Sequence, residues 1–320
     1  MSQPSQPRPR LHVLLASPRG FCAGVDRAIR IVQGALAQRS GKPVYVRHEI
    51  VHNRRVVENL EAEGAVFVEE VAEVPHGAPV VFSAHGVAKS VPADAARRGL
   101  SFHDATCPLV SKVHREAERH FAERRHILMI GHAGHPEVEG TMGQLPPGAI
   151  TLVQSAEEAR SVVPARADRL AFITQTTLSV EDAAEIVGIL RARFPAIEGP
   201  RKEDIYYATT NRQMAVRAIA PECDLVIVIG SANSSNSQRL REVAERAGAP
   251  RAILLPEARA LDWSALEGVG TLGLTAGASA PERLVEELID ALGERYELAI
   301  EERRVTRESV VFKLPSALAS

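Results

Sequence analysis

The sequence predicts an α/β protein made of three pseudo-symmetric α/β units with parallel sheets around a central site. Short apolar, β-branched runs alternate with helix-like segments, which is typical of parallel strands buried on both faces. Cys22 and Cys107 each lie between such a run and a helical pattern. A third turn of the same kind carries Tyr206 in the corresponding place, so the spacing indicates units of about 90–100 residues.

The expected strands follow from the apolar runs, taken in chain order. They are 11–16, 44–46, 65–68, 80–83, 127–130, 150–153, 170–174, 225–229, 252–255 and 271–275. Apolar residues at helical spacing lie between them, most clearly at 179–194, 235–247 and 281–292. Pro281 suits the first turn of the last helix, with Ser279 or Ala280 as its cap.

The same spacing predicts the division of the chain. We expect residues 1–10, which are rich in proline and polar side chains, to form a disordered tail. The three α/β units are predicted at 11–106, 107–203 and 204–293, and the charged segment 294–320 as a C-terminal tail. Since the carboxyl ends of parallel strands collect ligands, three units facing inward would bring Cys22, Cys107 and Tyr206 together.

The composition excludes several classes of function. A net charge of −2 and an aromatic content of 4 % argue against a nucleic-acid partner. No stretch approaches the roughly 20 apolar residues of a membrane span, and the N-terminus lacks the apolar core of a signal peptide. Three cysteines in 320 residues do not make a disulfide framework, so we expect a cytoplasmic location.

The turn around Cys22 is the first candidate for chemistry. Gly20 and Gly24 flank the cysteine, and the amides of the following helix favour its thiolate. Cys107 has an equivalent place before Pro108, a residue suited to a first helical turn. A metal ligand or nucleophile fits both positions, whereas a small buried apolar residue is the alternative for either one alone.

Polar residues crowd the other predicted strand ends. Short hydroxyls, amides and imidazoles together with helix N-termini can hold a diphosphate without lysine. Structural histidines and a simple helix cap in the serine-rich turn are the alternatives. The residues concerned are His52, His85, His135, Glu137, Thr176, Ser234, Ser235, Asn236 and Ser279.

His135 and Glu137 are the best acid–base candidates. Two residues apart on an extended segment, both side chains would face the same side. Burial near a diphosphate would raise the pKa of the Glu137 carboxyl, so that it could deliver a proton. The zinc-protease, phosphate-loop and dinucleotide-binding motifs are all missing from the sequence.

Taken together, these stretches resemble the 4-hydroxy-3-methylbut-2-enyl diphosphate reductase (LytB) family. No single piece is decisive, but the set in this order is highly specific and spans nearly the whole chain. The matching stretches are 18–29, 48–53, 83–87, 104–108 with 112–114, 131–144, 174–180, 207–213, 230–240 and 275–281.

The resemblance implies the last step of the methylerythritol phosphate route to isoprenoids. Two electrons and protons remove the hydroxyl of an allylic diphosphate as water, giving isopentenyl and dimethylallyl diphosphates. It further implies three α/β units around a 4Fe-4S cluster held by three cysteines with an open fourth iron. Flavodoxin or ferredoxin is the expected electron donor.

The resemblance also assigns roles to residues of this chain. Cys22 and Cys107 match two of the cluster cysteines. Glu137 matches the proton-relay carboxylate and Thr176 the residue that positions the substrate alcohol. The diphosphate site is matched by His52, His85, His135, Ser234, Ser235, Asn236 and Ser279.

Tyr206 stands where the family pattern has its third cluster cysteine. Three interpretations follow: the phenolate ligates iron, Cys223 replaces the lost thiolate, or the cluster is labile, smaller or absent. The predicted function is accordingly a LytB-type reductase, with either the family's cluster ligation or an altered one. The alternatives are a non-redox diphosphate-binding paralogue without a cluster and a non-reductive Lewis-acid enzyme such as a hydratase.

Overall fold

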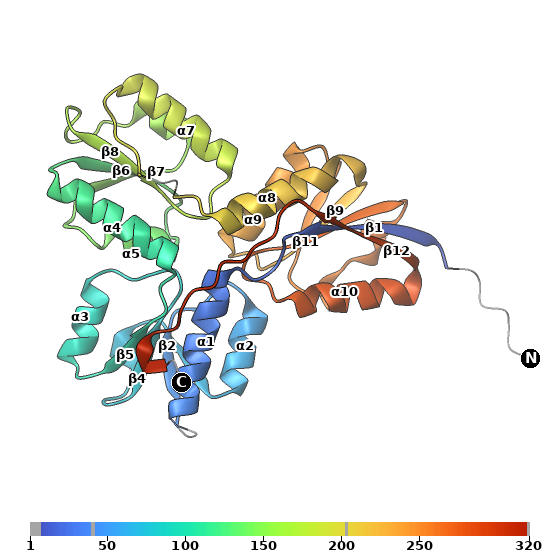
Figure 1. Cartoon of the computed structure of the whole chain (residues 1–320), viewed down its shortest axis with the longest axis horizontal. Coiled ribbons are helices and arrows are strands. Elements are labelled where there is room, and N and C mark those ends of the chain that lie inside the picture. The colour runs from blue at the N-terminus through green and yellow to red at the C-terminus, as the bar shows by residue number, and fades with distance from the viewer. Residues whose placement is uncertain (1–7, 40–41, 202–203, 319–320) are drawn as a thin grey trace, which may run out of the picture. The chain divides into compact units, whose positions relative to one another are not determined.

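The computed structural model describes residues 8–39, 42–201 and 204–318 (Figure 1). The chain forms two compact units, which we call the terminal unit (Met1–Cys22 with Tyr207–Ser309) and the central unit (Ala23–Tyr206 with Val310–Ser320). Two of the three points at which the chain passes between units therefore directly follow Cys22 and Tyr206. None of the helices in the described ranges is sufficiently long and apolar to span a bilayer.

The terminal unit contains a five-stranded sheet in the order β10-β9-β11-β1-β12, with every neighbouring pair parallel. The strands are β1 (Arg10–Ser17), β9 (Leu225–Ile229), β10 (Ala252–Leu255), β11 (Thr271–Ala276) and β12 (Glu297–Arg304). The helices are α8 (Tyr207–Ile219), α9 (Ser235–Arg246) and α10 (Glu282–Arg295), with short 3₁₀ turns η2 (Ala220–Glu222), η3 (Ala258–Ala260) and η4 (Trp263–Leu266).

The inner strands of this sheet, such as β9, are covered on both faces, which explains their continuous apolar sequences. Successive residues of β9 point to opposite faces, so Ile227 packs against α10 while Val226 packs against α8 and α9. All five residues of β9 are buried. A strand enclosed in this way cannot show the alternating polar pattern of a half-exposed strand.

The central unit contains two smaller parallel sheets, β3-β2-β4-β5 and β7-β6-β8. The first sheet consists of β2 (Val44–Arg47), β3 (Ala65–Val68), β4 (Pro79–Phe82) and β5 (Ser101–Asp104). The second consists of β6 (His126–Ile130), β7 (Ile150–Val153) and β8 (Leu170–Thr174). The α/β class with three parallel sheets is therefore confirmed.

Most helices of the central unit lie between its strands in sequence, while α1 precedes β2 and α7 follows β8. They are α1 (Ala23–Gln38), α2 (Arg54–Ala62), α3 (Ser90–Arg97), α4 (Pro108–Ala122), α5 (Pro136–Met142), α6 (Ala156–Ser161) and α7 (Val180–Arg193), with 3₁₀ turns η1 (Val71–Glu73) and η5 (Ser316–Leu318). Pro108 occupies the first turn of α4 as predicted.

Three predictions about elements were wrong in detail. The strand at 11–16 does not join the strands that follow it, because β1 pairs with β11 and β12 of the terminal unit. Tyr206 directly follows a bend at Asp204 and Ile205, and among the described residues only the helix of its predicted strand-turn-helix unit is present. The residue before α10 is Pro281, without a side-chain cap from Ser279 or Ala280.

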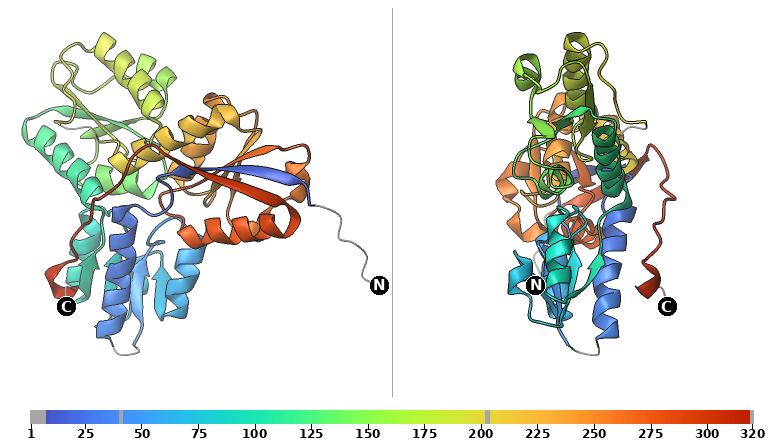
Figure 2. Two further views of the ribbon diagram at one scale, coloured as in Figure 1. Left: turned by 45° about the vertical axis from the view of Figure 1, so that its right-hand side comes forward. Right: turned by 90° about the vertical axis from the view of Figure 1, so that its left-hand side faces the viewer.

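The segment 294–320 is not a simple tail, since it contains β12, which runs beside β1 along the whole of that strand (Figure 2). β12 is mostly exposed and charged, a composition that protects sheet edges but hides the strand from a hydrophobicity pattern. At the other end, residues 1–7 of the predicted N-terminal tail lie outside the described residues, and Arg10 already begins β1. The division into three units of about 90–100 residues stays a prediction.

Candidate functional site

The predicted site residues form two groups, one in each unit. The central unit brings together a histidine cluster (His52, His85 and His135) and the pair Glu137–Thr176. The terminal unit brings together a serine cluster, consisting of Ser234, Asn236, Ser237 and Ser279. Each group can be described on its own geometry.

The histidine cluster is a close packing of three half-buried imidazoles. The rings of His52 and His85 stack with their centroids 4.0 Å apart. The His135 ring stands nearly perpendicular to both, at 5.4 Å from His52 and 5.8 Å from His85. The three histidines follow β2, β4 and β6 along the chain, so the carboxyl-end prediction holds for this group.

Glycines allow α5 to approach the loop that carries His85. A Cβ on Gly140 would come within 3.0 Å of the Gly86 backbone, and one on Gly143 would overlap the side chain of Ala88. Gly86 itself has φ of +82°, a conformation that favours glycine. These contacts bring His135, at the start of α5, against His85.

The surroundings of His85 and His135 favour the neutral imidazole in these two residues. Loss of water contact, followed by repulsion from His52 and His132, lowers the pKa of His135 to about 3. Desolvation and the neighbouring histidines likewise hold the pKa of His85 well below its usual value. An anion placed among these rings would reverse the repulsion, because it stabilises the protonated forms.

The local hydrogen bonds also orient His135. Its Nδ1 accepts the Glu137 backbone N–H at 3.1 Å, so the proton of the neutral ring is on Nε2. The His52 Nδ1 lies 3.1 Å from the Glu49 carboxylate, which orients that ring in turn. Sequence analysis missed Glu49, although its position three residues before His52 was visible.

Glu137 is buried, and its carboxylate is held by Thr176. Its carboxylate accepts the Thr176 backbone N–H at 2.7 Å and the Thr176 hydroxyl at 2.9 Å. Burial raises the pKa of Glu137 to about 7 even though both hydrogen bonds oppose that shift. The direction of the predicted shift is therefore confirmed, and the group can exchange a proton near neutral pH.

The predicted local conformation of this pair was wrong. His135 and Glu137 do not lie on an extended segment, because His135 caps α5 and Glu137 lies in its first turn. The proline at 136 suits a first helical turn, a signal that was present in the sequence. The pair is thus held more rigidly than an extended loop would hold it.

The serine cluster is built around the N-terminus of α9. Ser237 fills the space beside Gly230 and Gly277, where a Cβ on either glycine would overlap its side chain. Its hydroxyl donates to Ser234 Oγ at 3.0 Å, and Ser234 Oγ lies 3.5 Å from Ser279 Oγ. The α9 amides and these hydroxyls together offer several donors to an anion.

Asn236 is the member of this cluster whose side chain has no hydrogen-bond partner among the described residues. Its side chain is 4 % exposed, and within the described residues neither its amide nitrogen nor its oxygen has a hydrogen bond. An unpaired buried amide costs free energy unless a ligand or water satisfies it. The predicted role of Asn236 in binding a polar ligand is consistent with this geometry.

Cys22, Cys107 and Tyr206, the three positions predicted to hold an iron-sulfur cluster, share one backbone feature. The N–H groups of Cys22 and Cys107 donate to Ala278 O and Ala84 O, the carbonyls just before Ser279 and His85. The Tyr206 N–H donates to Thr176 O at 3.4 Å. Each position is therefore tied, within its own unit, to a loop that carries a predicted substrate residue.

The donor set fits an iron-sulfur group at two of these positions. Cys22 and Cys107 are 3 % and 7 % exposed, are not in disulfides, and each directly precedes a helix. Tyr206 directly precedes α8 in the same way, but its phenol is a harder donor than a thiolate. Cys22 belongs to the terminal unit and the other two to the central unit, so their convergence stays a prediction.

Cys223 does not replace the missing thiolate in this structure. It precedes β9, at the opposite end of the terminal sheet from Ala278 and Cys22, and its thiol donates to Ile219 O at 3.1 Å. Burial raises the pKa of this thiol to about 12. The thiolate that a cluster requires is therefore disfavoured here.

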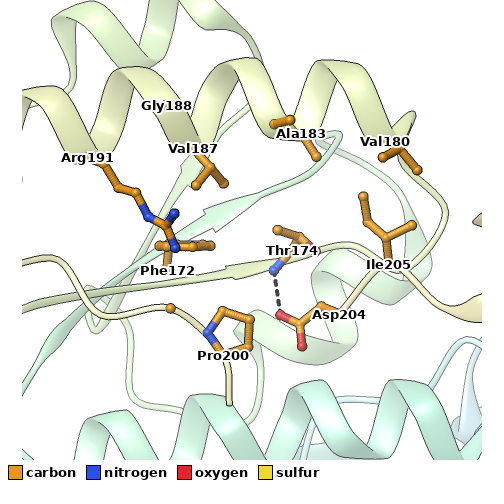
Figure 3. Close-up of a pocket in the computed structure, with 12 residues that line it drawn as sticks. Phe172, Thr174, Val180, Ala183, Val187, Gly188, Arg191, Pro200, Asp204 and Ile205 are labelled. Carbon is orange, nitrogen blue, oxygen red and sulfur yellow. Dashed lines mark hydrogen bonds between the residues drawn. The ribbon is translucent and has the colours of Figure 1, made fainter. Parts of the chain in front are cut away.

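The segment that leads to Tyr206 is anchored at Asp204. Its buried carboxylate accepts the Thr174 N–H at 2.9 Å (Figure 3). The same carboxylate pairs with Lys112 at 3.0 Å. Beside it, between α7 and the described residues 199–200 and 204–205, lies a cavity of about 350 Å³ with mostly apolar walls that include Val187 and Ile205. Lys112 and Asp204 lie in stretches noted in the sequence, but their pairing could not be foreseen.

A second group with metal-ligand chemistry is better explained by ion pairs. Atoms of His120, Glu123 and Glu198 lie within 4.8 Å of one another. Arg125 pairs with both carboxylates, and Arg119 pairs with Glu123 at 3.3 Å. These cations already neutralise the acidic groups on an exposed surface.

Comparison with known proteins gives one consistent family. The LytB protein family matches residues 13–293, from β1 to α10. A 4-hydroxy-3-methylbut-2-enyl diphosphate reductase of Gluconobacter oxydans is 72% identical over 313 residues, covering 97% of this chain and 93% of that protein. The reductase of the same name from Phenylobacterium zucineum is 64% identical, covering 98% of this chain and 99% of that protein.

A solved structure agrees with these matches. The E-1-hydroxy-2-methyl-but-2-enyl-4-diphosphate reductase from Plasmodium falciparum shares the fold with a TM-score of 0.91 and 37% identity. The similarity covers 97% of each chain.

Proposed function

Because the chain belongs to the LytB protein family, we propose that it reduces 4-hydroxy-3-methylbut-2-enyl diphosphate to isopentenyl and dimethylallyl diphosphate. The reaction takes up two electrons and two protons, and one proton leaves with the hydroxyl as water. The observation that carries this proposal is the buried Glu137 carboxyl, paired with Thr176 and with a pKa near neutrality.

The proposed cofactor is a 4Fe-4S cluster held by Cys22 and Cys107, with Tyr206 at the third position. When bound, the cluster supplies electrons and an open iron that acts as a Lewis acid toward the substrate oxygen. Two thiols at helix N-termini support this assignment. A harder third donor, or none, would make the cluster more easily lost than with three thiolates.

The proposed role of the two polar groups is to anchor the diphosphate. Hydroxyls of Ser234, Ser235 and Ser279 and the Asn236 amide offer donors from the terminal unit. His52, His85 and His135 offer imidazole N–H groups from the central unit. Anchoring the diphosphate orients the reacting carbon, and this positioning lowers the barrier.

The proposed proton path runs through Thr176. Protonated Glu137 donates to Thr176 Oγ1 while the Thr176 hydroxyl passes its own proton to the leaving oxygen of the substrate. The distance of 2.9 Å between the Thr176 and Glu137 oxygens permits this transfer. Burial keeps a large fraction of Glu137 protonated near pH 7, so the donor is available.

A non-redox paralogue that retains the diphosphate pocket is the second candidate, and Tyr206 is the observation that favours it. The test is anaerobic purification, iron and sulfide analysis, and a single turnover with chemically reduced donor. Brown protein that converts the substrate supports the reductase. Colourless protein that binds the diphosphate without converting it would support the paralogue.

The variant Tyr206→Cys locates the cause of any deficit. If Tyr206 weakens the cluster, this variant gains iron, sulfide and turnover together.

We also propose flavodoxin or ferredoxin as electron donor and a cytoplasmic location, the latter supported by three free cysteines.

A further inference from the structure

The turn that carries Cys22 is held by a buried arginine that the proposed mechanism does not use. Arg212 lies on α8, and its side chain is fully buried. Its Nε and Nη2 donate to Gly20 O at 2.9 and 2.8 Å, and Nη2 also donates to Phe21 O at 3.1 Å. The two acceptors are the residues immediately before Cys22.

The same guanidinium is neutralised by a residue near the C-terminus. Glu308 accepts from Nη1 of Arg212 at 2.9 Å and from Nη2 at 3.3 Å, and Asn211 donates to the same carboxylate at 3.0 Å. The remaining Nη1 contact is Ala208 O at 2.9 Å, one turn earlier on α8. Every acceptor is within the terminal unit, so this network does not depend on the other unit.

β12 explains how Glu308 reaches this place. The strand follows β1 in register from Arg10 to Ser17, and the Val305 N–H then donates to Ser17 O at 3.0 Å. The chain after β12 therefore arrives beside the end of β1, just before the Cys22 turn. The charged segment that had no predicted structure delivers the counter-ion of Arg212.

The opposite side of the turn is fixed by backbone bonds to the end of β11. The Gly20 and Cys22 N–H groups donate to Ala276 O at 3.1 Å and Ala278 O at 3.2 Å. Gly20 has φ of +66°, and a Cβ there would lie 3.2 Å from Ala280 O. The N–H groups of the turn are thus held by the sheet, and its carbonyls by Arg212.

We propose that Arg212, oriented by Glu308, is a positioning residue that sets the Cys22 sulfur for cluster ligation. This inference rests on the proposed function, since it assumes that Cys22 is a ligand. A lysine at position 212 cannot replace the guanidinium, because one ammonium cannot serve two carbonyls and a carboxylate in the same fork geometry. Partners behind a metal ligand orient it and influence metal retention.

The test measures Cys22 itself before it measures catalysis. In metal-free protein, Arg212→Lys should make alkylation of Cys22 about 10-fold faster, since the turn opens more often, while Cys107 keeps its rate. Mass spectrometry resolves the two sites, and the buried Cys223 reports global unfolding. In reconstituted protein, a chelator should remove iron about 10- to 100-fold faster than from the native chain.

Two further variants make the outcome decisive. Glu308→Gln keeps the shape of the Glu308 side chain but removes its charge. It should accelerate both Cys22 alkylation and iron release, as Arg212→Lys does. If Arg212→Lys does not fold, Glu308→Gln tests the proposal in its place. Val216→Ala removes packing one turn along α8 without touching the Cys22 turn, so it should leave Cys22 alkylation unchanged.

Unchanged Cys22 alkylation and iron release in folded Arg212→Lys or Glu308→Gln would overturn the proposal. Equal acceleration at Cys22 and Cys223 would also overturn it, because that result reports a general loss of stability. A native protein that neither binds iron nor converts the substrate would instead refute the proposed function, whereas the alkylation of metal-free protein would still measure the positioning of Cys22.

Discussion

The central and terminal units gather polar side chains by the same structural device but with different chemistry. In both, glycines let a helix pack closely against a loop that follows a parallel strand: Gly140 and Gly143 serve α5, and Gly230 and Gly277 serve α9. The central group consists of imidazoles and a carboxyl, whereas the terminal group consists of hydroxyls and an amide. Only the central group can change its charge near neutral pH.

This difference separates two tasks. The terminal group offers donors whose strength does not vary with pH, as suits an anchor. The central group contains Glu137, whose pKa burial raises to about 7, and His135, whose pKa burial lowers to about 3. We therefore expect pH dependence of binding and turnover to originate in the central unit.

The largest expected effect is the loss of turnover when the proton donor is removed. It tests whether titration in the central unit is separate from anchoring in the terminal unit. Glu137→Gln should reduce turnover by about 10²- to 10⁴-fold, because an amide cannot supply the proton. Diphosphate binding should be retained, since the proposed anchors are the histidine cluster and the serine cluster and do not include Glu137. Single-turnover kinetics and calorimetric binding measure the two effects. Glu139→Gln, an exposed neighbour on α5, is the matched control and should be active.

The second prediction concerns stability and pH. The folded-state pKa of Glu137 is raised, so the folded chain binds the proton more tightly and loses stability as pH rises from about 4.5 through about 7. The full loss is about 3 kcal/mol, the equivalent of the shift in pKa. Glu137→Gln should therefore show a flatter stability profile between pH 6 and 8 in denaturant titrations. A profile that parallels the native one would show that Glu137 is not the titrating group.

Histidine protonation gives the opposite dependence in the same unit. The folded-state pKa of His135 is lowered, so this residue costs stability as pH falls from about 6.5 toward 3. Binding of inorganic diphosphate should be accompanied by proton uptake, because the anion raises the pKa of the imidazoles. Calorimetry at pH 7 in buffers of different ionisation enthalpy measures this uptake. Its disappearance in His135→Asn would confirm the source.

The fourth prediction tests the glycine contacts that both units share. Gly143→Ala should destabilise the protein by about 1–3 kcal/mol through overpacking against Ala88 and weaken diphosphate binding. Gly230→Ala should do the same through Ser237. Gly188→Ala on α7 meets no atom within 4 Å and should be neutral or stabilising. If all three substitutions behave alike, close approach is not the cause.

The smallest effect compares two helix caps. Ser234→Ala and Ser155→Ala each remove a cap, of α9 and α6, and should cost about 1 kcal/mol of stability. Only Ser234→Ala should also weaken diphosphate binding, because Ser155 is not part of the anchor. Equal binding by both variants would assign Ser234 a purely structural role.

Much of the fold could be predicted because its strands are enclosed. Each of the ten predicted strands is present, since a strand covered on both faces must be a continuous apolar run. β12 was missed because it is an exposed edge whose charges serve solubility rather than packing. The partner of β1 could not be foreseen, since strand pairing joins segments far apart in the sequence.

The candidate site was predictable in its residue types but not in its contacts. Within each unit, the histidines, the Glu137–Thr176 pair and the Ser234–Ser279 pair come together as the strand-end argument requires. The supporting residues Arg212 and Glu308 carried no local signal of their pairing, because they are 96 residues apart. Their roles appear only in the packed structure.

The sequence by itself determined the α/β class, the buried strands and the kinds of side chain that follow them, because these are local consequences of apolar periodicity and turn chemistry. It also carried the family resemblance that the comparisons confirm. Only the tertiary structure decided which sheet β1 joins, which carboxyl is buried enough to hold a proton near pH 7, and which arginine supports the Cys22 turn. Pairing, desolvation and close packing depend on neighbours that the chain brings together only when it folds.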